Sequence, residues 1–324
     1  MAKGMNGLAT ANETSPDLAH QIDEILEGLL APQKHLSPKW FYDERGSELF
    51  DRICTLPEYY PTRTELSIMS AHLDEVAELV GPRAAVIEFG AGSSLKVRQL
   101  LDALDEPAAY VPVEISADYL LKQAEELARD YPDVHIQPVF ADFTQPFELP
   151  AHPVTPERNL VFFPGSTIGN FTRAEARNLL GVMRAEAKDD GALLIGVDLQ
   201  KDPEILHAAY NDSAGVTAEF NLNVLHRLNR ELGANFDVDA FRHEAVYDEE
   251  KGRIEMRLVS LANHIVTIAG RRIPFRRGEY IITEYSHKYS IEGFQAMARN
   301  AGFEPLRVWT DEQGLFSVHY MEAA

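Results

Sequence analysis

Cysteine is almost absent from this sequence, because Cys54 is the only one among 324 residues. A single cysteine excludes an internal disulfide framework and any metal site built from several thiolates. Cys54 lies among apolar neighbours in LFDRICTLPEYY, and free cysteine packs as a small hydrophobic side chain. We therefore interpret it as buried filler rather than as a nucleophile, and we expect a cytoplasmic protein.

Long apolar runs are also missing. No stretch approaches the roughly 20 apolar residues that a membrane-spanning helix needs. Residues 1–14 contain no apolar core segment, so they predict a disordered tail rather than a secretory signal. The 11 histidines show no metal-ligand spacing, and we predict no metal.

Basic residues are few relative to acidic ones: 30 Lys and Arg oppose 51 Asp and Glu, for a formal net charge of −21. Nucleic-acid binding draws most of its affinity from lysine and arginine that neutralise phosphates. A nucleic acid or an anionic membrane is therefore a disfavoured partner. By elimination we expect a small-molecule substrate, and we expect a monomer.

Between residues 64 and 199, short apolar runs alternate with helical patterns. The apolar runs span 84–89, 110–113, 134–140, 160–163 and 192–197, and the helical patterns span 95–104, 117–131 and 174–187. Thr172, followed by Glu175, predicts a capping box at the start of the last helix. Strands that alternate with helices favour an α/β fold with a mostly parallel sheet covered on both faces.

The remaining segments differ in composition. Residues 15–63 begin with a helix signalled by Ser15 and Pro16 and continue into a stretch rich in aromatic and turn-forming residues. The patterns predict a helix at 204–210, strands at 253–268 and 279–286, a helix at 291–301, and strands at 305–310 and 315–321. The last two strands are expected to complete the large sheet as a hairpin with one antiparallel strand.

Polar and glycine residues follow three successive predicted strands. The first strand ends at Gly90 and Gly92 in EFGAGSS, where glycines let the backbone approach a ligand closely. Glu114 follows the second strand, where an acidic side chain accepts hydrogen bonds from ribose hydroxyls. Asp142 and Phe143 follow the third, where a carboxylate and an aromatic face suit adenine. Each feature alone also fits an ordinary turn or a solvated loop charge, but together they favour a nucleotide site.

Features that the turn lacks narrow the choice of nucleotide. A dinucleotide fingerprint needs a third glycine where this sequence has Leu95, and no Walker lysine motif is present. S-adenosylmethionine has no phosphate and carries a positive sulfonium, so it tolerates Glu88 before the glycines. We predict S-adenosylmethionine as the cofactor. A nicotinamide-dependent oxidoreductase and a non-catalytic sensor of small molecules remain the alternatives.

Several long motifs resemble one family. After the fourth predicted strand the sequence reads FPGSTIGNF, unlike the Asn/Asp-Pro-Pro-aromatic motif of enzymes that methylate bases. Together with KWFYDERGSELFDRICTLPEYYPTRTE, AYNDSAGVTAEFNLNVL and TEYSHKY, this stretch resembles the bacterial histidine Nα-methyltransferases of ergothioneine biosynthesis. The resemblance covers about residues 37–320. A relative that methylates another free amino acid or amine remains an alternative.

The resemblance implies a fold, a reaction and a division of the chain. The fold is a Rossmann-like class I methyltransferase domain with an added α+β substrate-binding domain. The reaction is methylation of the α-amino group of L-histidine, three times, to hercynine, the first step of ergothioneine biosynthesis. We expect 64–199 and 287–324 to bind S-adenosylmethionine, and 15–63 and 200–286 to bind the substrate.

The resemblance also implies site residues. The donor-binding positions are Gly90, Lys96, Glu114, Asp142 and Phe143, to which the glycine turn adds Gly92. The histidine-binding positions are Tyr59, Asn170, Tyr210, Glu284 and Ser286, with Tyr42 and Met256 as further pocket residues. Glu114 stands where the family pattern has aspartate, which keeps the same hydrogen-bonding role.

These residue types suit a free amino acid. Asn170 and Tyr210 offer neutral donors to a carboxylate, and Glu284 accepts from an imidazole N–H while Ser286 satisfies the other ring nitrogen. Glu284 and Ser286 are spaced by two on a predicted strand and share a face. Pattern alone favours a solvent-facing edge for this strand, and the resemblance reverses that preference. Methyl transfer needs a neutral amine, so we expect the enzyme to supply proximity and orientation, with Tyr42 as the proton relay.

Overall fold

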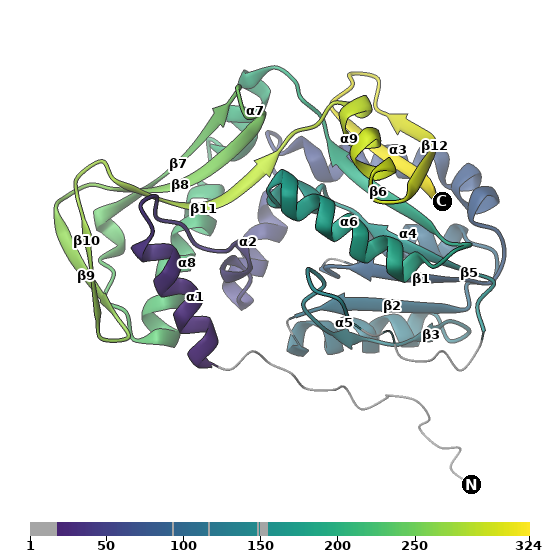
Figure 1. Cartoon of the computed structure of the whole chain (residues 1–324), viewed down its shortest axis with the longest axis horizontal. Helices are drawn as coiled ribbons and strands as arrows, with labels where there is room; N and C mark the ends of the chain where they lie inside the picture. The colour runs from purple at the N-terminus through teal and green to yellow at the C-terminus, as the bar shows by residue number, and fades with distance from the viewer. Residues whose placement is uncertain (1–17, 93, 116, 148, 150–154) are drawn as a thin grey trace, which may run out of the picture.

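The computed structural model describes residues 18–92, 94–115, 117–147, 149 and 155–324. The tail expected at 1–14 and the helix signal at Ser15 and Pro16 lie outside these residues. The described chain forms a large mixed sheet covered by helices, beside a smaller unit of antiparallel strands and helices (Figure 1).

The large sheet has the strand order β12-β13-β6-β5-β1-β2-β3, with β4 also paired to β2. Its strands are β1 (Ala84–Phe89), β2 (Ala109–Glu114), β3 (His135–Ile136), β4 (Val139–Phe140), β5 (Arg158–Phe163), β6 (Ala192–Asp198), β12 (Phe303–Thr310) and β13 (Phe316–Ala323). Strand β1 pairs in parallel with β2 on one side and β5 on the other, so the strand order reverses here. Sheets of this kind bind ligands at the carboxyl ends of the strands beside such a reversal.

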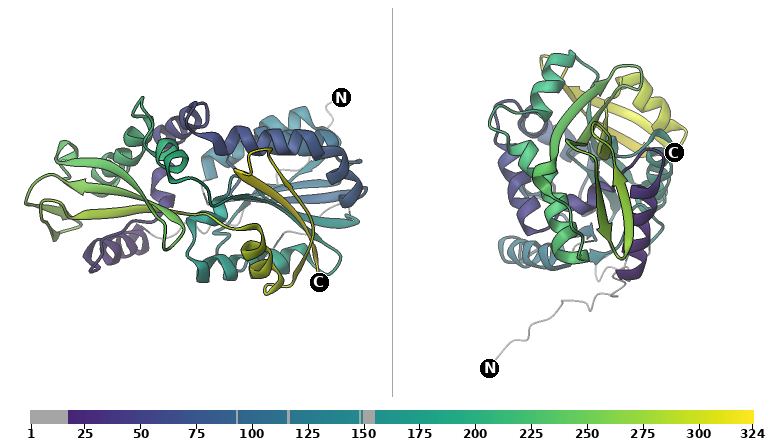
Figure 2. Two further views of the ribbon diagram at one scale, coloured as in Figure 1. Left: turned by 90° about the horizontal axis from the view of Figure 1, so that it is seen from above. Right: turned by 90° about the vertical axis from the view of Figure 1, so that its left-hand side faces the viewer.

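Helices cover both faces of this sheet. One face packs against α3 (Tyr60–Val80), α4 (Leu95–Ala103) and α5 (Ala117–Asp130), and the other against α6 (Arg173–Ala187) and α9 (Ile291–Arg299) (Figure 2). Along β1, Val86 packs with the first group and Ile87 with the second, as alternation on a strand requires. The predicted α/β fold with a mostly parallel sheet is therefore confirmed.

Two local predictions are confirmed as well. Thr172 Oγ1 accepts from the backbone N–H of Glu175, and the Glu175 carboxylate accepts from the backbone N–H of Thr172, which forms the predicted capping box of α6. Strand β13 lies antiparallel between β6 and β12, so the chain ends in the predicted hairpin.

Other elements differ from the prediction. Residues 134–140 form two short strands, β3 and β4, because Pro138 between them has no N–H for the ladder. The long helix α3 was not predicted. The asparagine-rich segment forms helix α8 (Val216–Leu232), in which buried Asn221 and Asn223 donate to side chains of other elements. These tertiary contacts offset the weak helix propensity of asparagine.

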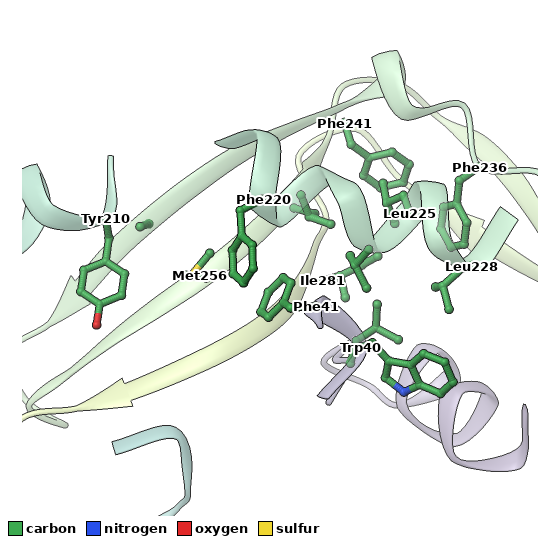
Figure 3. Packing of buried hydrophobic residues seen from close by; sticks show 14 of the residues in the cluster. Trp40, Phe41, Tyr210, Phe220, Leu225, Leu228, Phe236, Phe241, Met256 and Ile281 are labelled. Carbon is green, nitrogen blue, oxygen red and sulfur yellow. The ribbon is translucent and has the colours of Figure 1, made fainter. Parts of the chain in front are cut away.

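The smaller unit is built from antiparallel strands and helices. Its elements are α1 (Leu18–Leu30), η1 (Pro38–Phe41), α2 (Glu44–Cys54), α7 (Pro203–Tyr210), α8, η3 (Val238–Ala240), and strands β7 (Phe241–Asp248), β8 (Arg253–Ser260), β9 (His264–Ile268), β10 (Arg271–Phe275) and β11 (Tyr280–His287). Strands β7, β8 and β11 form one sheet and β9 and β10 a hairpin. Aromatic side chains such as Trp40, Phe41 and Phe220 fill its core (Figure 3).

Two elements connect the cores of the sheet and the smaller unit. Helix α3 begins with Tyr60 in the core of the smaller unit and continues with Ile68 in a core of the large sheet. Strand β11 leaves the small sheet toward the bridge between Leu199 and Tyr289 at the end of β6. The domain boundaries at residues 63, 200 and 286 stay a prediction.

Candidate active site

The turn after β1 leaves room for a ligand. Gly90 has φ +72°, the left-handed region that favours glycine, and a Cβ there would lie 3.4 Å from the Phe143 ring. No described atom lies within 4 Å of a Cβ built on Gly92. The backbone N–H groups of Gly90 and Ala91 donate to the carbonyl of Val113, at 2.9 and 3.4 Å, which fixes the turn against β2.

The predicted acidic residues lie at the same edge of the sheet. Glu114 ends β2, and its Oε1 accepts from the backbone N–H of Ile115 at 2.8 Å. Asp142 follows β4, and its Oδ1 accepts from the N–H and the hydroxyl of Thr144 at 3.0 and 2.6 Å. Because β2 pairs with both β1 and β4, these carboxylates and Gly90 share one rim.

Lys96 is held by a carboxylate that the sequence reasoning missed. Its Nζ lies 2.5 Å from Glu65 Oε2, and Glu65 is almost fully buried on α3. The N–H of Gly165 donates to both oxygens of Glu65 at 2.9 Å. A Cβ on Gly196 would lie 1.9 Å from Glu65 Oε1, so glycine on β6 makes space for this carboxylate. In the sequence, the only signal for this role of Glu65 was its position as an acidic residue within an otherwise apolar helix face.

Glu88 lies under the glycine turn, 2% exposed, and accepts from the Tyr110 hydroxyl at 2.5 Å. Burial raises the pKa of Glu88 to about 7, although the hydrogen bond from Tyr110 and the charge of Lys96 oppose the shift. Carboxylates beside the bound ligand would repel a phosphate group, whereas they would attract a sulfonium cation. The open turn and the acidic rim therefore fit S-adenosylmethionine.

Three predicted tyrosines converge from separate segments. Tyr42 follows η1, Tyr59 precedes α3 and Tyr210 ends α7. The rings of Tyr59 and Tyr210 are 6.2 Å apart, and Phe50 lies 5.8 Å from Tyr42 and 6.4 Å from Tyr59. Figure 3 shows Tyr210 at the edge of the core cluster, with its hydroxyl turned away from Met256.

Tyr42 is partly exposed and packs edge-on against the rings of Phe50 and Phe220. Its side chain is 38% exposed, yet burial raises the pKa of its phenol well above the usual value, with the charge of Glu284 as the next contributor. The phenol is therefore neutral at physiological pH.

Glu284 is a buried carboxylate to which none of the described residues donates a hydrogen bond. It lies on β11 opposite Met256 of β8 and is 9% exposed. No residue in the described part of the chain hydrogen-bonds to its side chain. Burial raises the pKa of Glu284 to about 7, with Lys288 opposing the shift. Several causes raise the pKa of Tyr59, and the charge of Glu284 ranks among them after burial and other neighbours. Glu284 and Tyr59 therefore lie in one region.

Asn170 is brought to this region by the turn η2 (Thr167–Asn170). Gly165 and Ser166 both have positive φ and turn the chain after β5, and Ser166 Oγ accepts from the N–H of Asp198 at 2.9 Å. A Cβ on Gly169 would lie 2.8 Å from the carbonyl oxygen of His287, so glycine lets η2 contact β11. The half-buried amide of Asn170 forms no hydrogen bond with any residue that the structure describes.

Tyr210 and Ser286 belong to one buried hydrogen-bond network. The Tyr210 hydroxyl lies 2.8 Å from Ser286 Oγ. Lys288 Nζ donates to the Tyr210 hydroxyl at 3.0 Å and to Ser286 Oγ at 2.7 Å, and it pairs with Asp198 Oδ2 at 2.7 Å. Sequence reasoning missed Lys288 and Asp198. The available signal was that Lys288 is spaced by two from Ser286 in TEYSHKY.

Asp198 connects this network to the large sheet. Its Oδ1 pairs with Lys201 at 2.6 Å, and the Tyr60 hydroxyl donates to both of its oxygens at 2.8 Å. Although burial favours the neutral acid, Lys288 and Lys201 hold the pKa of Asp198 below its usual value. Burial lowers the pKa of Lys201 to about 8, against the charge of Asp198.

Three further features concern the cysteine, possible metal ligands and the helices. Cys54 is half-buried rather than fully buried, and burial raises the pKa of its thiol, which makes it a poorer nucleophile. Within the described ranges, no group of three or more His, Cys, Asp or Glu side chains is arranged to hold a metal ion. None of the helices there is both long and apolar enough to span a membrane.

Comparison with known proteins agrees with this geometry. The family described as "Histidine-specific methyltransferase, SAM-dependent" matches residues 21–323. The histidine N-alpha-methyltransferase of Mycolicibacterium smegmatis is 39% identical over 318 residues, covering 96% of this chain and 98% of the relative. The enzyme of that name from Mycobacterium tuberculosis is 40% identical over 320 residues, with the same coverage.

A more distant relative is longer than this chain. "Ergothioneine biosynthesis protein 1" of Neurospora crassa is 33% identical over 283 residues, which are 85% of this chain and 32% of the relative. The full-length family match and the two relatives near 40% identity decide the assignment. The chain belongs to the family of histidine-specific methyltransferases that use S-adenosylmethionine.

Proposed function

We propose that this chain transfers methyl groups from S-adenosylmethionine to the α-amino nitrogen of L-histidine, three times, giving hercynine in ergothioneine biosynthesis. The observation that carries the proposal is Glu284, a buried carboxylate whose pKa is about 7 and which has no described protein partner. An imidazole N–H is a complementary donor for it. The printed names of the relatives, histidine N-alpha-methyltransferase and ergothioneine biosynthesis protein, support the same reaction.

On the donor side, the turn at Gly90 and Gly92 accommodates the methionine part of the donor, and Glu114 binds the ribose hydroxyls. Asp142 and Phe143 hold the adenine. Lys96 contributes a cation close to the donor carboxylate, and Glu65 fixes its position by the ion pair at 2.5 Å. When bound, S-adenosylmethionine supplies an electrophilic methyl group on its sulfonium.

On the acceptor side, Asn170 and Tyr210 donate hydrogen bonds to the carboxylate of histidine. Glu284 and Ser286, which share a face of β11, hold the imidazole ring, and Met256 and Tyr59 form the walls around it. This assignment uses two groups without hydrogen-bond partners among the described residues, the Glu284 carboxylate and the Asn170 amide, to bind two different parts of the substrate.

The chain's contribution to chemistry is orientation and removal of a proton. An α-amino group has to lose its proton before it can attack, and holding it in line with the methyl group supplies proximity. Tyr42 conveys that proton away from the amine. Because burial raises the pKa of this phenol well above its usual value, Tyr42 does not act as a stored phenolate base. It gives its hydroxyl proton to solvent water, to which the residue is 38% exposed, while it receives one from the amine.

Aromatic rings around the acceptor support repeated transfer. The rings of Tyr42, Phe50, Tyr59 and Tyr210 follow one another at centroid distances of 5.8, 6.4 and 6.2 Å. Aromatic faces attract methylated ammonium cations, so the mono- and dimethylated products are held for the next transfer.

The proposal includes the organisation of the chain. Residues 64–199 and 287–324 bind the donor, and 15–63 and 200–286 bind histidine. The enzyme acts as a monomer in the cytoplasm, without nucleic acid or membrane as a partner.

The test is mass spectrometry after incubation of the purified chain with S-adenosylmethionine and the twenty amino acids together. We expect histidine alone to gain methyl groups, and trimethylhistidine to accumulate at long times. Methylation of another amino acid with histidine unchanged would overturn the substrate assignment. A product that stops at one methyl group would overturn the threefold transfer.

A further inference from the structure

The proposed function assigns no positively charged side chain to the substrate carboxylate. The two donors assigned to it, Asn170 and Tyr210, are neutral, and Glu284 places a carboxylate in the same region. Binding an anion beside another carboxylate in a desolvated site is costly unless a cation compensates. The cation has to be close, yet it need not touch the substrate.

Lys288 supplies such a charge from behind the site. Its side chain is fully buried and donates to three oxygens, at 2.7 Å to Asp198, 2.7 Å to Ser286 and 3.0 Å to Tyr210. An ammonium has three protons, so these bonds use all of them. Although burial favours the neutral amine, Asp198 raises the pKa of Lys288 above its usual value, and Lys288 stays charged.

The charges of this network do not cancel. Asp198 carries one negative charge and pairs with both Lys288 and Lys201, at 2.7 and 2.6 Å. When both lysines are protonated, one positive charge remains in the buried network. The Tyr210 hydroxyl transmits this remaining positive charge to the proposed substrate site, because Lys288 donates a hydrogen bond to it directly.

The hydroxyl protons of Tyr210 and Ser286 are constrained by the same lysine. Both oxygens accept from Lys288, and they lie 2.8 Å from each other, so one hydroxyl donates to the other. One hydroxyl proton is then left for a ligand. When that proton is on Tyr210, Ser286 Oγ holds the imidazole ring by accepting from a ring N–H. The phenol is the more acidic hydroxyl, and donation by Lys288 and Ser286 to its oxygen strengthens its own donation further.

Resting on the proposed function, we propose that Lys288 is a positioning residue for the substrate carboxylate, which it attracts through the hydroxyl of Tyr210. Asp198 holds the lysine in place. Lys288 directs the Tyr210 proton toward the carboxylate, polarises that hydroxyl, and balances the charge of the anion without contacting it.

The test compares two ligands that differ in the carboxylate. Isothermal titration with saturating S-adenosylhomocysteine measures the Kd of L-histidine and of histamine, which has the ring and amine but no carboxylate. For Lys288→Met we expect the Kd of L-histidine to rise about tenfold or more, and that of histamine to change less than about twofold. The matched control is Lys251→Met, a surface lysine paired with Asp248, which should leave both values unchanged.

A double-mutant cycle with L-histidine alone tests the route through Tyr210. In a Tyr210→Phe background, Lys288→Met should add little to the loss, whereas independent effects would be additive. Lys288→Gln keeps hydrogen-bond donors in the network and removes only the charge, so it provides a second variant if methionine prevents folding.

The outcomes separate the inference from the proposed function. Equal losses for L-histidine and histamine, or additive losses in the cycle, would overturn the assignment of Lys288. Failure of the unmodified chain to bind L-histidine would instead overturn the proposed function. A rise in the KM for S-adenosylmethionine as large as that for histidine would show that Lys288 has a general structural effect, and would also contradict the inference.

Discussion

Two buried glutamates on neighbouring strands have opposite electrostatic surroundings. Glu255 on β8 lies between Arg253 and Arg257, with a separation of 2.7 Å to each, and these partners hold its pKa below the usual value despite burial. Glu284 on β11 has no such partner, and burial raises its pKa to about 7. The first carboxylate is paired within the protein, whereas the second has no hydrogen-bond partner in the part of the chain that the structure describes.

This contrast predicts that replacing glutamate by glutamine has opposite effects on stability at the two positions. Because the pKa of Glu284 is about 7 in the folded state and 4.5 in the reference state, the folded protein binds more protons between these values, and its stability falls as pH rises through them. Glu284→Gln should therefore raise the free energy of unfolding at pH 8 by about 1–3 kcal/mol, with no gain at pH 4, while raising the KM for histidine. Urea denaturation at both pH values measures it.

The matched control is Glu255→Gln, which removes a carboxylate that two arginines stabilise. It should lower the free energy of unfolding at pH 8, because both guanidinium groups lose their partner. A Glu284→Gln protein that is less stable at pH 8 and binds histidine normally would contradict the account of Glu284.

At the scale of elements, the contact between η2 and β11 depends on one glycine. A Cβ on Gly169 would lie 2.8 Å from the carbonyl oxygen and 3.2 Å from the nitrogen of His287, both backbone atoms. Gly169→Ala should push the turn away from β11, displace Asn170, and destabilise the protein by about 1–3 kcal/mol. We expect the KM for histidine to rise while the KM for S-adenosylmethionine stays close to that of the unmodified chain.

Gly181→Ala is the control for this change. Gly181 lies on the exposed side of α6, where an added Cβ meets no described atom within 4 Å. Alanine there should raise stability by about 0.5–1 kcal/mol, because it is the better helix former. Melting curves measure the stability of both variants, and steady-state kinetics measure their KM values. Equal effects of the two alanine substitutions would contradict the role of the contact between η2 and β11.

The elements also show which predictions a sequence supports. The strands of the large sheet, the capping box of α6 and the final hairpin follow from local patterns, and so does the grouping of Gly90, Glu114 and Asp142 at the ends of neighbouring strands. Helix α8 was missed because its asparagines become favourable only through tertiary partners such as His243 and Asp43.

The same limit applies to the site. The family resemblance named Tyr210 and Ser286 separately, for different parts of the substrate, and the structure places their oxygens 2.8 Å apart. Lys288 and Asp198 were missed because they meet only where the ends of β11 and β6 come together. A pairing of that kind leaves no periodic pattern in the sequence.

At the scale of the whole molecule, continuous elements connect the residues proposed to bind the methyl donor with those proposed to bind histidine. Helix α3 begins beside the pocket at Tyr60, where the hydroxyl donates to Asp198, and carries Glu65 to Lys96 at the donor rim. Strand β11 carries Glu284 and Ser286 and then reaches Lys288 between the two units. Under the proposed assignment, these elements direct the methyl donor and the acceptor toward one another.

The most direct measurement of this central claim is a crystal structure with S-adenosylhomocysteine and L-histidine bound together. We predict the adenosine against Gly90, Glu114 and Asp142, and the histidine ring against Glu284 with its amine toward the sulfur. S-adenosylhomocysteine bound away from that rim, or histidine with its ring outside the reach of Glu284, would contradict the account.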